Sequence, residues 1–181
     1  MHERPQASLI EALRTLGYCI DSENNKLPLT IHAGGPTFKS CRVSIEESSQ
    51  FASALLLLAK LGGWNVEIDG ELGAKSPYVA MTSSLIKRFP SDGGRLEIEP
   101  DASSGSYFWA AGHILSLGTC LPLKVARWPK SGWQIDAEFT SFLPLPNIVS
   151  RRDDLGDSIM TAIVIAPLTG HQTQFVNLER L

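Results

Sequence analysis

Apolar residues along the chain recur in three dense runs, and each run follows a short cluster of small polar residues. The runs with their polar clusters are Ala52–Lys60 after Ser48-Ser49-Gln50-Phe51, Tyr107–Leu117 after Asp101-Ala102-Ser103-Ser104, and Ile159–Leu168 after Gly156-Asp157-Ser158. Serine and aspartate are favoured at helix starts because their side-chain oxygens accept hydrogen bonds from the N–H groups of the first turn. The pattern predicts three capped helices that are apolar on most sides and therefore buried.

A buried helix start is a favourable place for an anion, because its N–H groups and the positive end of the helix dipole face the ligand. We therefore expect a phosphorylated or carboxylated ligand at these starts. A plain capping role is the alternative interpretation for Ser48 and Ser49. Asp157 could be either a cap or a general base.

Shorter elements are predicted between the three runs. Ser8 and Glu11 have the spacing of a capping box, and apolar residues then recur at helical spacing up to Gly17, which predicts an amphipathic surface helix. Pro77 suits the first position of a further helix that reaches about Phe89. The pattern also predicts strands at 28–32, 42–45, 64–68, 95–98, 121–125 and 171–177, a turn at 34–36, and a short helix within 135–143.

The order of these elements predicts the fold class. Helices and strands alternate, which is typical of an α/β (α+β) fold with repeated units of helix and strand rather than one wound sheet. A new helix cap begins directly after Pro100, so we expect this proline to be the hinge between two parts, residues 1–99 and residues 100–181.

Composition excludes several classes of function. The 16 Lys and Arg against 19 Asp and Glu give a net charge of −3, which argues against general binding to nucleic acids or anionic membranes. There is no apolar run of the roughly 20 residues that a membrane span requires, and the N-terminus does not resemble a signal peptide. Cys19, Cys41 and Cys120 lie in no metal-ligand spacing. We expect them to be small core residues, with no metal site, in a cytoplasmic protein.

Five short motifs occur along the chain in a specific order. They are Arg4-Pro5, Ser48-Ser49-Gln50-Phe51 with Ser53-Ala54-Leu55-Leu56, Pro77-Tyr78-Val79 with Met81-Thr82, Asp101-Ala102-Ser103-Ser104 with Ser106-Tyr107-Phe108, and Asp157 with Met160-Thr161. In this order and spacing they resemble the 5-enolpyruvylshikimate-3-phosphate synthases, which are 3-phosphoshikimate 1-carboxyvinyltransferases. The resemblance covers nearly all of this chain but only the middle of the family's length.

The resemblance implies a reaction and a fold. Members of this family transfer the enolpyruvyl group of phosphoenolpyruvate to the 5-hydroxyl of shikimate 3-phosphate, and they use no metal or organic cofactor. Their fold consists of two domains built from inverse βαβαββ units with buried helices. By this resemblance, residues 1–99 are part of the domain that binds shikimate 3-phosphate, and residues 100–181 are part of the second domain.

The resemblance also implies which residues bind the shikimate substrate. Ser48 and Ser49 would bind shikimate 3-phosphate, largely through its phosphate. Gln50 would contact both substrates. Ser76 and Tyr78 would contact the shikimate side, although the family's serine normally lies one position earlier, where this chain has Lys75.

Three further residues acquire roles in the same way. Arg4 would hold phosphoenolpyruvate, because a guanidinium binds carboxylate or phosphate in a bidentate manner. Asp157 would accept the proton of the 5-hydroxyl, and Asn177 would be another contact on the shikimate side.

The chain departs from the family pattern in ways that bear on activity. After Asn177 it reads Leu178-Glu179-Arg180-Leu181, where the family has Lys-Glu-x-x-Arg. The N-terminal and C-terminal thirds, which supply most of the cations that face the substrates, have no counterpart. We therefore expect this polypeptide to be inactive alone and to form a homo-oligomer or bind partner segments. The alternatives are a non-catalytic remnant that binds an anion or a partner chain, and an enolpyruvyl transferase that acts on UDP-N-acetylglucosamine.

Overall fold

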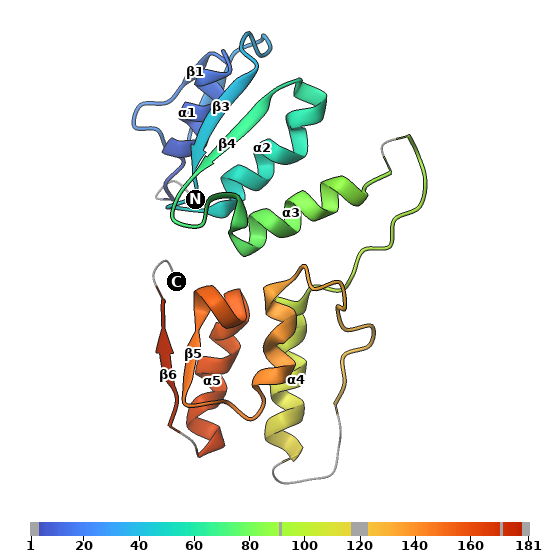
Figure 1. Cartoon of the computed structure of the whole chain (residues 1–181). Coiled ribbons are helices and arrows are strands. Elements are labelled where there is room, and N and C mark those ends of the chain that lie inside the picture. The colour runs from blue at the N-terminus through green and yellow to red at the C-terminus, as the bar shows by residue number, and fades with distance from the viewer. Residues whose placement is uncertain (1–3, 91, 117–122, 171, 179–181) are drawn as a thin grey trace. The chain divides into compact units, whose positions relative to one another are not determined.

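The computed structural model describes residues 4–90, 92–116, 123–170 and 172–178. The chain divides into two compact units, Met1–Phe89 and Pro90–Leu181. Both units contain helices and short strands, so the fold is mixed α/β (Figure 1). The division comes before Pro100, and the assignment of the two parts to the family's domains stays a prediction.

The first unit is built around a parallel strand pair. Its elements are α1 (Ala7–Thr15), β1 (Ile20–Asp21), β2 (Thr30–Ile31), β3 (Ser40–Ser44), α2 (Ser49–Gly62), β4 (Asn65–Asp69), the 3-10 turn Gly73–Lys75 and α3 (Pro77–Arg88). Strands β3 and β4 pair in parallel, with Ser40 opposite Asn65. Helix α2 connects them, so this segment is a βαβ crossover (Figure 1). Strands β1 and β2 form a separate antiparallel pair.

The core of the first unit lies between this sheet and the helices beside it. Cys41 and Val43 alternate with exposed residues along β3 and are buried. Leu16 after α1 and Leu55 of α2 belong to the same apolar cluster. At the end of α2, the Trp64 ring lies against the backbone of the helix, and a Cβ on residue 62 would come within 1.7 Å of that ring. Only glycine fits at this position.

The second unit contains a similar crossover. Its elements are α4 (Ala102–Ser116), a 3-10 segment (Ile135–Phe142), β5 (Ile148–Ser150), a π-turn (Arg151–Leu155), a 3-10 turn (Gly156–Ser158), α5 (Ile159–Thr169) and β6 (Gln174–Val176). Strands β5 and β6 are parallel and α5 connects them (Figure 1). Fully buried side chains from the 3-10 segment, β5, the π-turn and α5 form the core, namely Phe139, Val149, Leu155 and Ile159.

A hydrogen bond between two hydroxyls joins a pair of helices in each unit. Ser53 of α2 and Thr82 of α3 are 2.8 Å apart, and Ser106 of α4 and Thr161 of α5 are 2.7 Å apart. Thr82, Ser106 and Thr161 are buried. The two threonines belong to the Met-Thr motifs of the sequence, so one role of these motifs is to hold helices together.

The long helices and most of their ends confirm the sequence predictions. Helices α2, α3, α4 and α5 lie where predicted, within two residues at their starts, and Pro77 is the first residue of α3. The short helix within 135–143 is a 3-10 segment. The strands predicted at 28–32, 42–45, 64–68 and 171–177 correspond to β2, β3, β4 and β6, although β2 and β6 are shorter than predicted.

Several local predictions are wrong. Helix α1 begins at Ala7 with Gln6 as its cap, so Ser8 lies inside the helix and forms no capping box. Residues 34–36 form no tight turn, and residues 95–98 form no strand. Residues 123–125 form none either, and the rest of that predicted strand lies outside the described residues. Strands β1 and β5 were not predicted, because a strand of two or three residues is too short to show a pattern.

Burial of the helices is one-sided, which corrects the prediction that they are covered on most sides. In α2 the buried residues are Phe51, Ala52 and Leu55, whereas Leu61 is 88% exposed. In α5, Val164 is 67% exposed. Each helix packs on the elements of its own unit with one face and leaves apolar side chains on the other.

The cysteines differ from one another. Cys41 is buried as predicted, but Cys19 is exposed, which corrects its assignment to the core. Cys120 lies outside the described residues. Among the helices of the described part of the chain, none is long and apolar enough to cross a membrane.

Candidate functional site

The start of α2 combines serine hydroxyls with a first turn that contains no acidic side chain. Ser48 has an extended backbone, and its hydroxyl oxygen accepts a hydrogen bond of 3.2 Å from the N–H of Gln50. Ser48 and Ser49 are partly exposed and Gln50 is exposed. The cap is therefore a neutral group, and the positive end of the helix dipole keeps its attraction for an external anion.

The start of α3 lies in the same region of the first unit. Ser76 immediately precedes Pro77, its hydroxyl makes no capping hydrogen bond, and Tyr78 is half-buried in the first turn. The Ser53–Thr82 hydrogen bond joins the two helices four and five residues after their first residues. At 1.5 Å per residue, each helix start is about 6–8 Å along its axis from this bond.

Helix α4 begins differently, because it is capped by a carboxylate of its own. One oxygen of Asp101 accepts a hydrogen bond of 3.0 Å from the N–H of Ser103, and the other accepts one of 2.6 Å from the hydroxyl of Ser104. The side-chain oxygen of Gln134 accepts a third, of 2.9 Å, from the N–H of Ala102. An external anion at this helix start would meet a negative charge that is already in place.

At the start of α5, the cap is Asp136 rather than Asp157. The carboxylate of Asp136 is 4% exposed and accepts a 2.6 Å hydrogen bond from the N–H of Ser158. The side chain of Asp157 is 56% exposed and forms a 2.8 Å ion pair with Arg151. The capping role considered for Asp157 is therefore wrong. Its role as a proton acceptor stays a prediction.

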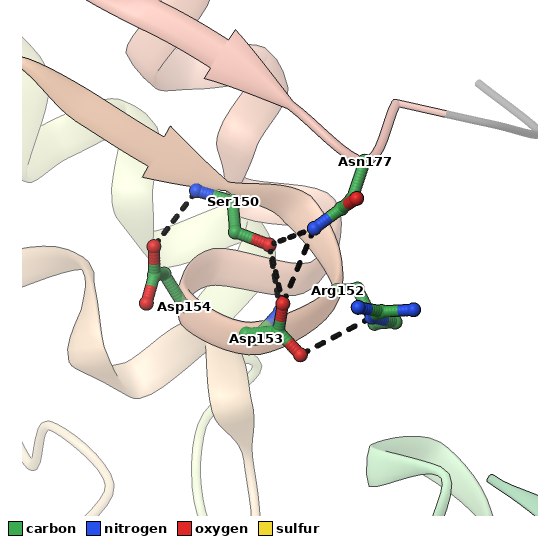
Figure 2. Close-up of polar contacts among 5 residues, drawn as sticks. All are labelled: Ser150, Arg152, Asp153, Asp154 and Asn177. Atoms are coloured by element: carbon green, nitrogen blue, oxygen red, sulfur yellow. Dashed lines mark hydrogen bonds and ion pairs between the residues drawn. The ribbon is translucent and has the colours of Figure 1, made fainter.

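Polar side chains converge where β5 ends (Figure 2). The N–H of Ser150 donates a 2.7 Å hydrogen bond to Asp154, and the Ser150 hydroxyl donates one of 2.9 Å to Asp153. The amide nitrogen of Asn177 donates to the Ser150 hydroxyl oxygen at 3.0 Å and to Asp153 at 3.2 Å. Asn177 has a φ of +53°, which asparagine tolerates better than most residues. The π-turn and the segment after β6 are thereby linked.

The hydrogen bonds of this cluster favour the charged form of Asp153. Its pKa is lowered, first by the hydrogen bond from the Ser150 hydroxyl and then by Arg152, whose guanidinium lies 3.2 Å from the carboxylate, and by Asn177. Arg151, in the same turn, pairs with Asp157. The structure therefore brings Asp157 and Asn177 to one short turn, each through a contact with one of its residues.

The remaining residue of the predicted site, Arg4, is exposed in the segment before α1. Three residues with contacts in this region, Asp136, Arg151 and Asp153, were not predicted from the sequence. Arg151 and Asp153 had a signal, since a run of four charged residues, Arg151-Arg152-Asp153-Asp154, begins one residue after the apolar Ile148-Val149 pair. Asp136 had none, because its partner is 22 residues away in the sequence.

The fold and the polar groups together define an α/β protein with a small-ligand type of site. Each unit has a parallel βαβ crossover, and polar side chains gather where strands end and helices begin. In α/β proteins this is the common place for a small polar ligand. The comparison with known families is more specific: residues 1–92 match the EPSP synthase (3-phosphoshikimate 1-carboxyvinyltransferase) family. The chain belongs to the EPSP synthase family.

Relatives in several bacteria are similar to most of the chain. A 3-phosphoshikimate 1-carboxyvinyltransferase of Laribacter hongkongensis is 38% identical over 94% of this chain and 43% of its own length. One of Burkholderia ambifaria is 39% identical over 79% of this chain and 38% of its own length. The chain thus spans about two fifths of the length of the curated relatives it matches.

Proposed function

We propose that this chain forms part of the substrate site of an enolpyruvyl transferase and binds the phosphate of shikimate 3-phosphate at the start of α2. The neutral cap of α2 is the observation that supports this proposal most directly. Carboxylates of the chain occupy the starts of α4 and α5, whereas the hydroxyl of Ser48 occupies that of α2. A dianion is repelled at the first two places and attracted at the third.

Near the start of α2, two glutamates oppose the binding of an anion and several hydrogen-bond donors favour it. Glu46 and Glu47 precede the cap, but both are exposed, and water and salt screen their repulsion. Ser49 and Gln50 add accessible donors, and the Ser53–Thr82 hydrogen bond holds α3, with Ser76 and Tyr78 at its start, beside α2. Hydroxyl and amide donors beside a helix N-terminus are suited to a phosphorylated polyol.

The reaction itself is proposed from the family and from the exposed position of Asp157. By the resemblance, Asp157 accepts the proton of the 5-hydroxyl, Asn177 contacts the shikimate side, and Arg4 holds phosphoenolpyruvate. A carboxylate that is half exposed can be reached by a bound hydroxyl and can accept its proton. The two substrates carry several negative charges, but Arg151 and Arg152 already have carboxylate partners within the chain. We therefore propose that the 181-residue chain binds substrate without efficient turnover.

Calorimetry with shikimate 3-phosphate tests the binding step. We expect saturable binding by the 181-residue chain and a loss of at least about tenfold in affinity in the Ser48→Ala/Ser49→Ala variant, since two donors to a charged group are removed. The matched control is Ser103→Ala/Ser104→Ala at the carboxylate-capped start of α4, which should leave the affinity unchanged. Equal losses in both variants would contradict an anion site at α2.

A phosphate-release assay with phosphoenolpyruvate tests turnover. We expect a rate far below a typical kcat of about 10 s⁻¹, and a rate within tenfold of that value would refute the proposal of an inactive chain. Repeating the calorimetry with UDP-N-acetylglucosamine distinguishes the other enolpyruvyl transferase class. If neither ligand binds, the result would support a purely structural remnant. Because the apolar Leu61 and Val164 are exposed, we expect self-association, which sedimentation would test.

A further inference from the structure

Three side chains of metal-binding chemistry lie together on the β1–β2 ribbon, in a part of the chain that the proposed transferase site does not use. They are Cys19, Asp21 and His32, and one ligand atom from each lies within 4.8 Å of the other two. From this arrangement we propose that the ribbon binds one divalent transition-metal ion, with Zn²⁺ as the best match.

The backbone explains why the three side chains share one face. Ile20 pairs with Ile31 and Asp21 with Thr30, so the next antiparallel pair is Cys19 with His32. The N–H of His32 indeed donates a 3.0 Å hydrogen bond to the carbonyl of Cys19. Directly opposed residues project to the same face of a ribbon, and so do residues two apart on one strand. Cys19, Asp21 and His32 therefore point the same way because of the register.

The ligand types select the metal. A thiolate, an imidazole and a carboxylate are the donors that Zn²⁺ takes in proteins, whereas Mg²⁺ and Ca²⁺ prefer oxygen alone. A tetrahedral Zn²⁺ ion holds its ligand atoms about 3.5 Å from one another. Side-chain rotations that move these atoms by about an ångström would therefore let all three residues bind one ion. All three residues are exposed, which leaves the fourth position to water.

The Asp21–His32 contact shows that this set is already partly assembled. Nε2 of His32 lies 2.6 Å from a carboxylate oxygen of Asp21. An ion that binds both atoms takes the place of the proton of this hydrogen bond, and ligation by Cys19 also releases the proton of its thiol. The backbone pairing of the ribbon needs no change for this exchange. The sequence gives no hint of the site, because Cys19 and His32 become neighbours only through the pairing of β1 with β2.

Titration of the purified chain with Co²⁺ and Zn²⁺ tests this proposal. With a non-thiol reductant present, we expect one equivalent of Co²⁺ to produce the ultraviolet charge-transfer band of a cobalt–thiolate bond, and Zn²⁺ to displace it. Competition with a chromophoric chelator would give the affinity. Cys19→Ser should abolish the band, and His32→Gln should weaken binding at least about tenfold, since even residues that only orient metal ligands contribute 10–100-fold.

Two matched variants serve as controls. His113→Gln removes a histidine of α4, and Cys41→Ala removes the buried thiol of β3, so neither should change the affinity or the band. The altered residues of the ribbon are exposed, and circular dichroism would verify that their variants stay folded. Absence of a cobalt–thiolate band in the unaltered chain would overturn the proposal. So would a band that persists in Cys19→Ser or an unchanged affinity in His32→Gln.

Discussion

The starts of α2 and α5 lie in similar surroundings but are capped by different groups. Both helices connect parallel strands, and both belong to a helix pair joined by a hydrogen bond between two hydroxyls. The start of α2 is capped by the adjacent Ser48, whereas the start of α5 is capped by the buried carboxylate of the distant Asp136. A neutral local cap leaves the helix dipole available to a ligand, while a buried anion uses the dipole for stability.

The largest expected effect of this difference is on stability. Asp136→Ala removes the acceptor from a buried N–H and leaves that donor unsatisfied, so we expect a loss of about 2–3 kcal/mol in the free energy of unfolding. Ser48→Ala removes an exposed cap and should cost about 1 kcal/mol. Urea unfolding of both variants measures the two losses. A larger loss for Ser48→Ala than for Asp136→Ala would contradict the idea that the buried carboxylate contributes more to stability.

The two hydroxyl contacts between helices give the next effect. Ser106 and Thr161 are both buried, so Ser106→Ala should cost about 1–2 kcal/mol by leaving Thr161 without this partner. Ser53→Ala should cost less, because the Ser53–Thr82 pair is only partly buried. A double-mutant cycle with Ser106→Ala and Thr161→Val measures the coupling of the pair. Additive losses in urea unfolding would show that the contact contributes nothing.

The smallest effect concerns acid stability at the end of β5. The hydrogen bond from the Ser150 hydroxyl lowers the pKa of Asp153 in the folded chain, with Arg152 adding to it. A lowered folded pKa stabilises the fold above the unfolded pKa, and this stabilisation is lost as the pH falls through the folded value. Thermal unfolding of Asp153→Asn and the unaltered chain between neutral and acid pH should therefore converge at low pH. A constant difference at every pH would exclude this role of the carboxylate.

Among the elements, those with a long local pattern could be predicted from the sequence. Helices α2 and α4 follow polar caps and extended apolar runs, and Pro77 marks the first residue of α3. Strands β1 and β5 could not be predicted, because two or three residues show no periodicity. The capping box at Ser8 was wrong because α1 begins at Ala7, a choice that its packing decides rather than its caps.

In the candidate site, too, local patterns could be predicted and long-range contacts could not. The serines at the start of α2 and the exposed Asp157 could be found from the sequence, because a helix cap and a family motif are local patterns. Only the tertiary structure revealed that Asp136 caps α5 and that Cys19 lies opposite His32. Both facts depend on contacts between segments far apart in the chain. The sequence by itself thus determined, to within one residue, where α2, α3 and α4 begin, and it determined which family the chain resembles. The tertiary structure decided that a buried carboxylate lies at the start of α5 whereas a neutral serine lies at the start of α2, since long-range pairing places Asp136 beside Ser158.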